Sequence, residues 1–232
     1  MSVGDVFNYL QGTSDIAVAL RLILATVLGS LVGWERIATH HSAGIKTFSL
    51  VSLGSAVATA LNIYLAMMPG LSSDAARISA GVVNGIGFLG AGTILVTGRK
   101  QIKGLSTAAT LWVTACMGMA IGAGYLAVGI TAFILIVFTN IVLLHLSNSV
   151  ESHSQYLSIY IEVSKERGVT ELHRFISEKG FVVMSMNKSK DKTILPSDTG
   201  LIINLKLDSS ASHHEILKLF NKLDYVTYVE EV

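Results

Sequence analysis

The chain has one cysteine, Cys116, and few charged residues, and both shortages limit what the protein can be. A single cysteine forms no intrachain disulfide, so nothing indicates an oxidising compartment, and a free thiol usually packs as a small hydrophobe. Only 14% of the 232 residues are charged, against about 25% in a typical soluble domain. With 51% hydrophobic residues, this composition argues against an ordinary soluble protein.

The charge is also spread unevenly along the chain. Residues 1–150 carry 4 acidic and 7 basic side chains, whereas residues 151–232 carry 12 acidic and 10 basic ones. This contrast predicts two regions that face different solvents. A net charge of +1 gives no indication of nucleic-acid binding. The N-terminus has neither a basic start nor a small-residue cleavage site, so the first apolar stretch is expected to be retained.

Five apolar stretches precede residue 148, and each is close to the ~20 residues that a membrane-spanning helix needs. They cover residues 16–34, 47–68, 77–97, 106–123 and 125–146. The loops after the first and third stretches hold the basic residues Arg36, Lys46, Arg99, Lys100 and Lys103. Because basic loops stay in the cytoplasm, we expect the N-terminus outside and everything after the fifth span inside.

No acidic residue lies within these stretches. Mg²⁺ prefers oxygen ligands, so a conduit lined by carboxylates is disfavoured. The charge within a span belongs to Arg21; snorkelling to the surface explains both Arg21 and Arg77. Glu35, Arg36 and Lys46 at the cytoplasmic helix ends are the sharper functional candidates, although charges there also set topology.

Glycines and small polar residues recur at helical spacing. The pairs Gly29/Gly33, Gly81/Gly85 and Gly118/Gly122 favour close helix packing within the bundle, with association of several copies as the alternative. The run from Gly85 to Gly90 matches a dinucleotide fingerprint but lies inside a hydrophobic stretch, so it predicts a weakened or broken helix beside Asn84 instead.

Two polar stripes run along single helix faces. They consist of Ser49, Ser52, Ser55, Thr59 and Asn62, and of Thr107, Thr110 and Thr114. Hydrogen bonding inside the bundle is the favoured interpretation, with a hydrated pathway as the alternative.

The final third changes pattern. After a polar linker at 148–155, residues 156–232 alternate as β-α-β-β-α-β, which predicts a small α+β ferredoxin-like domain. Regulatory ACT modules share this order, and Gly168 lies where they place a ligand loop, although a plain turn glycine is the favoured interpretation. Ser212 to Glu215 fits a capping box, which places His213 and His214 at a helix start, where we expect them to be solvated.

Four blocks of sequence resemble the MgtC/SapB family of membrane proteins. They are Gly33–Arg36, Ala43–Thr47, Arg77–Gly92 and Lys103–Trp112, in family order and spacing. The resemblance covers roughly residues 16–147, and the C-terminal domain is similar to the ACT-like tail of the MgtC branch. It implies a bacterial inner-membrane protein with a five-span domain at 1–147 and an ACT-like cytoplasmic domain at 156–232.

The resemblance also implies functional residues. These are Glu35, Arg36, Thr47, Arg77, Asn84, Gly85, Gly87, Gly90, Gly92 and Thr107, and we add Arg21, Lys46 and Lys103 from the charge pattern. The chain departs from the family where Ile37 replaces Glu, Lys46 replaces Arg and Gly81 replaces Gln. An Arg-to-Lys change loses bidentate geometry.

Family members are associated with survival at low Mg²⁺ and inside host cells, a link to virulence, and they are thought to modulate other membrane proteins, the F-type ATP synthase among them. We therefore expect a non-enzymatic regulator without a cofactor, whose partners are the lipid bilayer and another membrane protein, with a homo-oligomer left open. A transporter or channel for Mg²⁺ or another small solute is the alternative. An enzyme would need Glu35 or Asp74 to meet a partner base in a cavity.

Overall fold

A computed structural model describes residues 3–39, 41, 43–70, 74, 77–96, 102–146, 154–165, 167–189, 192–207 and 212–232. They form two compact units, one of Met1–Leu95 with Lys103–Leu143 and one of Val96–Ile102 with Leu144–Val232. Most of the predicted linker at 148–155 lies outside the described residues, as do Arg99 and Lys100 of the topology prediction.

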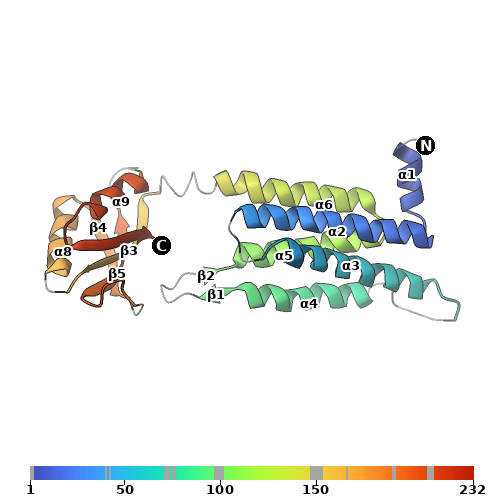
Figure 1. The fold of residues 1–232 in the computed structure, drawn as a ribbon, viewed down its shortest axis with the longest axis horizontal. Coiled ribbons are helices and arrows are strands. Elements are labelled where there is room, and N and C mark those ends of the chain that lie inside the picture. Colours follow the sequence, from blue (N-terminus) through green and yellow to red (C-terminus); the bar gives the residue numbers. More distant parts are fainter. Residues whose placement is uncertain are drawn as a thin grey trace. The chain divides into compact units, whose positions relative to one another are not determined.

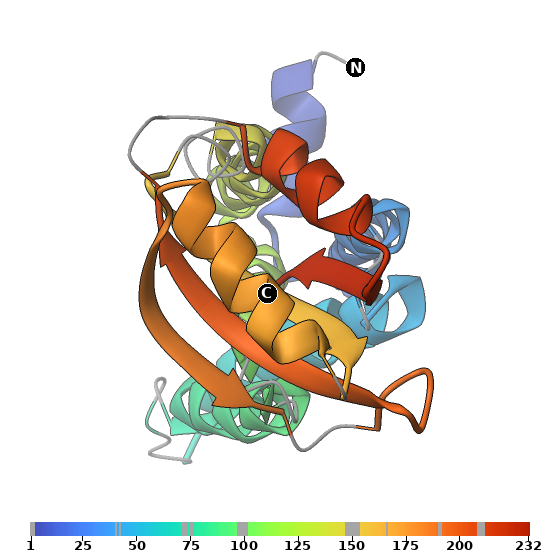
Figure 2. The same ribbon diagram turned by 90° about the vertical axis from the view of Figure 1, so that its left-hand side faces the viewer.

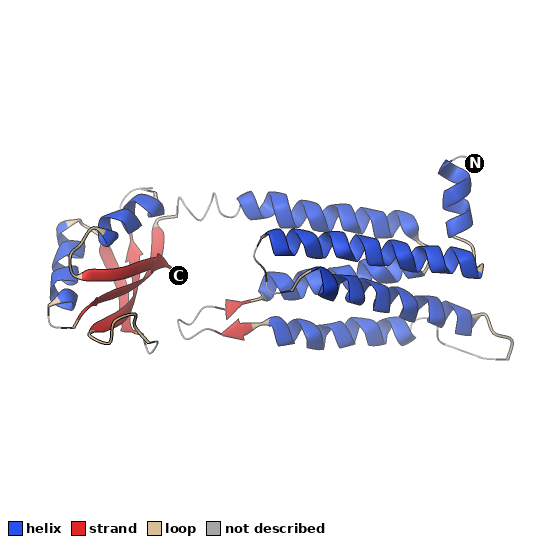
Figure 3. Ribbon diagram, viewed as in Figure 1, coloured by secondary structure: helices blue, strands red, loops and turns tan. Residues whose placement is uncertain are grey.

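The first unit is a bundle whose long helices run side by side (Figures 1 and 3). Its helices are α1 (Val3–Leu10), α2 (Asp15–Ala38), α3 (Ile45–Ala66), α4 (Arg77–Thr93), α5 (Leu105–Gly122) and α6 (Leu126–Phe138). A five-residue π-helix, η1 (Thr139–Leu143), continues α6. Two short strands, β1 (Leu95–Val96) and β2 (Ile102–Lys103), pair between α4 and α5.

Four helices are long and apolar enough to cross a membrane, namely α2, α3, α5 and the run Leu126–Leu146 that contains α6. Four of the five predicted spans are therefore confirmed as helices with the length and apolarity that a crossing needs. The remaining one, α4, has 17 residues, at the lower end of the range of about 17–25 for a spanning helix. The crossing by α4 therefore stays a prediction.

Glycines bring α2 and α5 onto α3. A side chain added at Gly29 would lie 2.7 Å from the carbonyl oxygen of Phe48, and one at Gly33 would lie 2.5 Å from Cα of Ile45. Gly118 and Gly122 on α5 press equally closely on the α3 backbone. The packing prediction is confirmed for these two pairs, since only glycine permits such an approach.

The prediction for α4 is wrong in two respects. The helix runs unbroken from Arg77 to Thr93, because glycine weakens a helix but keeps the backbone N–H that sustains it. Gly81 and Gly85 have no close neighbour in the described part of the chain, since an added side chain at either would meet none of its atoms within 4 Å. Of the glycines in α4, Gly90 is buried, with a neighbour in Ala108 of α5.

The polar stripe on α3 is largely satisfied by helix backbone. Ser52 Oγ donates across the helix contact to the carbonyl oxygen of Ala25 at 2.7 Å, as the interhelical interpretation predicted. Ser55 and Thr59 instead donate to carbonyl oxygens one turn earlier in their own helix, at 2.8 and 2.9 Å. The protons of these three hydroxyls are therefore all donated to helix backbone inside the bundle.

The second unit is a four-stranded antiparallel sheet with two helices on one face (Figure 2). Its elements are β3 (Tyr156–Ser164), α8 (Gly168–Glu178), β4 (Val182–Lys188), β5 (Asp198–Lys206), α9 (His213–Asn221) and β6 (Val226–Glu231). The strand order β4-β5-β3-β6 places β5 and β6 on either side of β3. The β-α-β-β-α-β order agrees with the prediction, while the ACT-like identity stays a prediction.

The core of this unit follows the alternation of β3. Ile159 and Ile161 are fully buried with Leu172 of α8 and Phe220 of α9. Glu162 is also buried, because its carboxylate accepts hydrogen bonds from the Tyr160 hydroxyl and from the backbone N–H of Ile194, at 2.7 and 2.8 Å.

Two expectations for this unit are wrong, the solvation of His213 and the capping box at Ser212. His213 is 3% exposed rather than solvated, and its ring nitrogens lie 2.7 Å from Glu231 Oε1 and 2.8 Å from the carbonyl oxygen of Ser154. His214, the next residue, is exposed as expected. Ser212 is the N-cap of α9, but its side chain makes no capping bond.

Candidate functional site

The most constrained polar group of the bundle is an ion pair at the C-terminal end of α2. Arg36 is 1% exposed, and its guanidinium meets the Glu35 carboxylate in a two-pronged contact: Nε to Oε2 and Nη2 to Oε1, each at 2.8 Å. Such forked pairs are the strongest hydrogen-bonded ion pairs in proteins. Burial makes the pairing necessary, because an isolated charge in this position would be very costly.

A π-helix brings a third partner to this pair. Asn140 lies in η1, and its Nδ2 donates to Glu35 Oε2 at 3.0 Å. The extra residue per turn of a π-helix rotates the side chains that follow, and such segments often occur at functional sites. Thr110 of α5 lies 3.4 Å from Asn140 Oδ1, but its single hydroxyl proton has a better acceptor at 2.8 Å, the carbonyl oxygen of Ser106.

The remaining donors of Arg36 reach the loop after α2 and the first turn of α5. Nη1 lies 3.4 Å from both His41 Nε2 and Ser106 Oγ. Arginine can only donate, so His41 Nε2 accepts and the ring proton is on Nδ1, 2.8 Å from Thr39 Oγ1. The pair thereby connects α2, α5, η1 and the segment that leads to α3. We call Glu35, Arg36, His41, Ser106 and Asn140 the ion-pair network.

The electrostatics of the network favour a neutral His41. Burial, and then the positive charge of Arg36, lower the pKa of His41 from its ordinary value of 6.5, against an opposing effect of Glu35. Both oxygens of Glu35 are occupied, which leaves little capacity to bind a cation or accept a substrate proton. Among the described residues, no group of three or more His, Cys, Asp or Glu could hold a metal ion.

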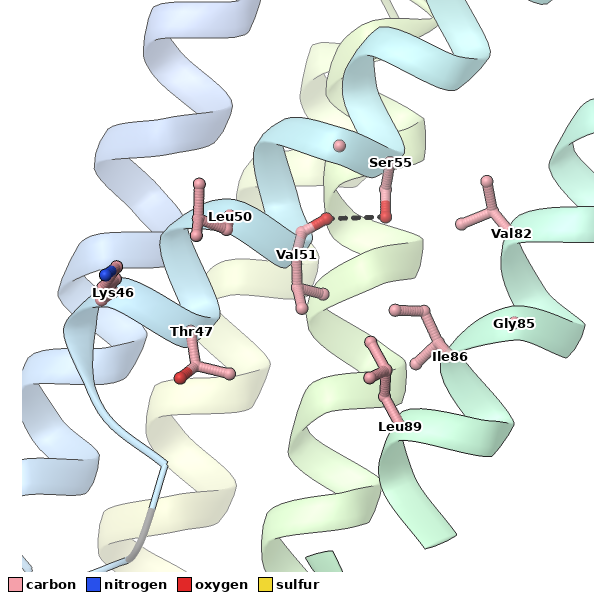
Figure 4. Close-up of a pocket in the computed structure, with 10 residues that line it drawn as sticks. Lys46, Thr47, Leu50, Val51, Ser55, Val82, Gly85, Ile86 and Leu89 are labelled. Carbon is pink, nitrogen blue, oxygen red and sulfur yellow. Dashed lines mark hydrogen bonds between the residues drawn. The ribbon is translucent and has the colours of Figure 1, made fainter. Parts of the chain in front are cut away.

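The structure separates the other predicted site residues from this network. Arg21 lies about 21 Å away along α2, where it is 4% exposed, packs against Gly124 and leaves Nε without a partner among the described residues. Lys46, Thr47 and Gly85 line a groove between α3 and α4 (Figure 4).

The rest of the predicted set is divided between surface and interior. Arg77, Asn84, Gly87, Gly92 and Lys103 are exposed, and Gly90 and Thr107 are buried. Only Glu35 and Arg36 of the predicted residues therefore belong to the ion-pair network. Three of its members, His41, Ser106 and Asn140, were not singled out from the sequence. The signal available for Asn140 was a lone amide in an otherwise apolar run.

The part of the chain that is similar to known proteins contains the ion-pair network. The MgtC family profile matches residues 22–149, which is more than half of the chain and includes the whole network. This chain belongs to the MgtC family. No solved structure gives a significant match.

Several relatives share the membrane part of this family member. MgtC of Salmonella typhimurium strain LT2 is 41% identical over 124 residues, 53% of this chain and 51% of the relative. YhiD of Escherichia coli K12, named as a candidate magnesium transporter, is 42% identical over 115 residues, 48% of this chain and 53% of the relative. SrpB of Synechococcus elongatus is 39% identical over 127 residues, 50% of this chain and 68% of the relative. The chain thus spans about half the length of the MgtC and YhiD relatives that it matches.

Proposed function

We propose that this MgtC-family membrane protein acts on a partner membrane protein without enzymatic chemistry, and that it supports adaptation to low Mg²⁺ and survival inside host cells. The observation that carries the proposal is the saturated Glu35–Arg36 pair. Its hydrogen bonds reach three helical elements, and its carboxylate has no free oxygen for acid–base work. An ion pair with these hydrogen bonds is suited to hold the helix ends in one arrangement. The partner protein would recognise that arrangement.

The proposed topology follows the distribution of basic residues. The N-terminus lies outside, α4 completes five spans, and the end that carries Arg36 and Lys103 faces the cytoplasm of a bacterial inner membrane. The C-terminal unit then lies in the cytoplasm as an ACT-like module that senses a ligand or docks. Its β-α-β-β-α-β order supports this assignment. The F-type ATP synthase is the first candidate for the partner.

The test is functional complementation in a strain that lacks its own family member, grown at low Mg²⁺. We expect the expressed chain to change the cellular ATP level and the membrane potential, and Arg36→Lys to lose most of this effect, because lysine has no fork for Glu35. Arg174→Lys, at an exposed arginine outside the predicted functional set, serves as a matched control. No change in either quantity with well-expressed wild type, or full activity of Arg36→Lys, would contradict the proposal.

Solute transport is the second candidate, and the name of the YhiD relative favours it. A path along the predicted polar positions has little support, since Ser52, Thr59 and Thr110 are buried between helices while Asn84 is exposed. Uptake of ²⁸Mg²⁺ into proteoliposomes that contain only this chain would distinguish the two functions. Uptake above that of empty liposomes would favour the transporter.

A further inference from the structure

An apolar groove separate from the ion-pair network lies between α3 and α4, with a volume of about 630 Å³. One wall is the α3 face of Leu50, Val51, Gly54 and Ser55, and the other is the α4 face of Val82, Gly85, Ile86 and Leu89. Val82, Ile86 and Leu89 point from α4 toward α3 (Figure 4). The volume lies within the range of about 300–1,000 Å³ that small-molecule sites occupy.

Polar groups gather at one end of the groove, where α3 begins. Lys46 and Thr47 line that end, and Lys46 is exposed and forms no ion pair with a described residue. The N-cap of α3 is Gly44, which has no side chain to satisfy the free N–H groups of the first turn. A helix start with a lysine and a hydroxyl is suited to an anion such as phosphate.

Beyond this end, the side chains that line the groove are apolar except for Ser55. Ser55 lies deeper along the wall, but its hydroxyl already donates to the carbonyl oxygen of Val51 at 2.8 Å (Figure 4). One end of the groove is therefore cationic, and the rest is lined by aliphatic side chains. We expect the helices that form it to lie in the lipid bilayer. This polarity matches an amphiphile with an anionic head.

The lining favours a lipid over a protein helix. From Lys46 to Ser55 the wall extends roughly 14 Å at ~1.5 Å per residue. Along that length the lining is almost entirely aliphatic, and its one cationic side chain is Lys46 at the end. An acyl chain carries no side chains and can lie along such a wall with its anionic headgroup at Lys46.

We propose that the groove between α3 and α4 binds an anionic phospholipid, with an acyl chain along the groove and the phosphate at Lys46 and the start of α3. This site is separate from the ion-pair network and does not rest on the proposed function. Gly54 and Gly85 leave the groove open, since a side chain added at either would meet no atom within 4 Å.

The glycines supply a direct test by native mass spectrometry of the full chain in detergent, titrated with phosphatidylglycerol or phosphatidylcholine of identical chains. We expect wild type to retain one phosphatidylglycerol in preference to phosphatidylcholine. Gly85→Leu and Gly54→Leu fill the groove from opposite walls and should abolish this retention. Lys46→Gln should reduce the preference for phosphatidylglycerol about fivefold, the contribution of one lysine beside anionic lipid.

Gly92→Leu is the matched control, because Gly92 is on α4, is equally free of neighbours and does not line the groove. It should bind lipid as wild type does. Retention that is unchanged in both filling variants, or a headgroup preference that survives Lys46→Gln, would overturn the proposal. So would a photoreactive residue at Leu50 that captures a protein chain instead of lipid in native membranes, since the groove would then hold a helix.

Discussion

At the scale of single residues, Arg36 concentrates the polar interactions of the bundle. Its donors reach Glu35 twice and His41 and Ser106 once each. Removal of one partner from such a buried pair leaves an uncompensated charge, whereas replacement of both partners removes the desolvation cost together with the attraction. The pair is therefore expected to matter more for which arrangement the helices adopt than for net stability.

This asymmetry predicts the outcome of a double-mutant cycle. Arg36→Met should lower the free energy of unfolding by about 3 kcal/mol, because the largely buried Glu35 carboxylate is left without its cation. Adding Glu35→Gln, which can still accept from Asn140, should restore most of that loss. Unfolding of the full chain in mixed micelles measures the free energies of unfolding of the single and the double variant, with Arg77→Met as a surface control. A double variant as unstable as Arg36→Met would contradict the assignment.

The lowered pKa of His41 predicts a pH dependence. The folded state favours the neutral ring, so below about pH 6.5 the unfolded chain binds more protons and stability falls as pH falls toward the folded pKa. Thermal unfolding at about pH 7.5 and about pH 5.5 should show a smaller loss for His41→Gln than for wild type. Equal losses in the two proteins would show that His41 is protonated alike in both states.

Two of the five network residues, Glu35 and Arg36, could be predicted from the sequence for a physical reason. Glu35 and Arg36 are conspicuous because charge at the end of an apolar run is costly. A π-helix turns Asn140 toward Glu35, and the spacing of hydrophobic residues in the sequence does not predict a π-helix. His41 depends on how the chain turns between two helices. The same limit explains His213, whose burial is set by Ser154 and Glu231, both far away in the chain.

At the scale of elements, identical glycine spacing has two different outcomes. Gly29/Gly33 and Gly118/Gly122 each bring two backbones together, while Gly81/Gly85 leaves its side of α4 open. The spacing predicts that a helix can be approached closely but not that a neighbour is present. Helix positions, in contrast, followed from hydrophobic length alone, and four of the five expected spans have the required length and apolarity.

The contrast predicts opposite effects of the same substitution. Gly118→Ala should destabilise the chain by about 1–3 kcal/mol, because the new methyl group collides with the backbone of Ser52. Gly87→Ala meets nothing and should be neutral or stabilise by about 0.5–1 kcal/mol through its better helix propensity. Unfolding in mixed micelles distinguishes the two. Similar effects at both positions would mean that α5 does not pack on α3 as described.

At the scale of the whole molecule, two hydrophobic cores form without shared residues, one in the helical bundle and one around the sheet. The second core includes residues from β3, β5, α8 and α9, which together supply a complete two-layer unit. This separation agrees with the change in charge density along the sequence. The fold of each part could be inferred from its own pattern, while the lining of the α3/α4 groove depends on how helices pack.

Separate cores predict that the sheet unit folds alone. A fragment of residues 154–232 should be soluble, unfold in one cooperative transition and lose stability in Phe220→Ala by about 3–5 kcal/mol. The exposed Leu219→Ala is the neighbouring control. Circular dichroism during thermal unfolding measures the transition. A fragment without a cooperative transition would show that this unit needs the bundle.

The account depends on the direction in which the helices cross the membrane, and the single native cysteine makes that measurable. In a Cys116→Ala background, cysteines at Met67, Lys103 and Val232 are tested in spheroplasts with a membrane-impermeant maleimide. We predict labelling of Met67→Cys in sealed spheroplasts, and labelling of Lys103→Cys and Val232→Cys only after the membrane is opened. Equal labelling of Met67→Cys and Lys103→Cys would show that α4 does not cross, and labelling of Val232→Cys from outside would contradict the account as a whole.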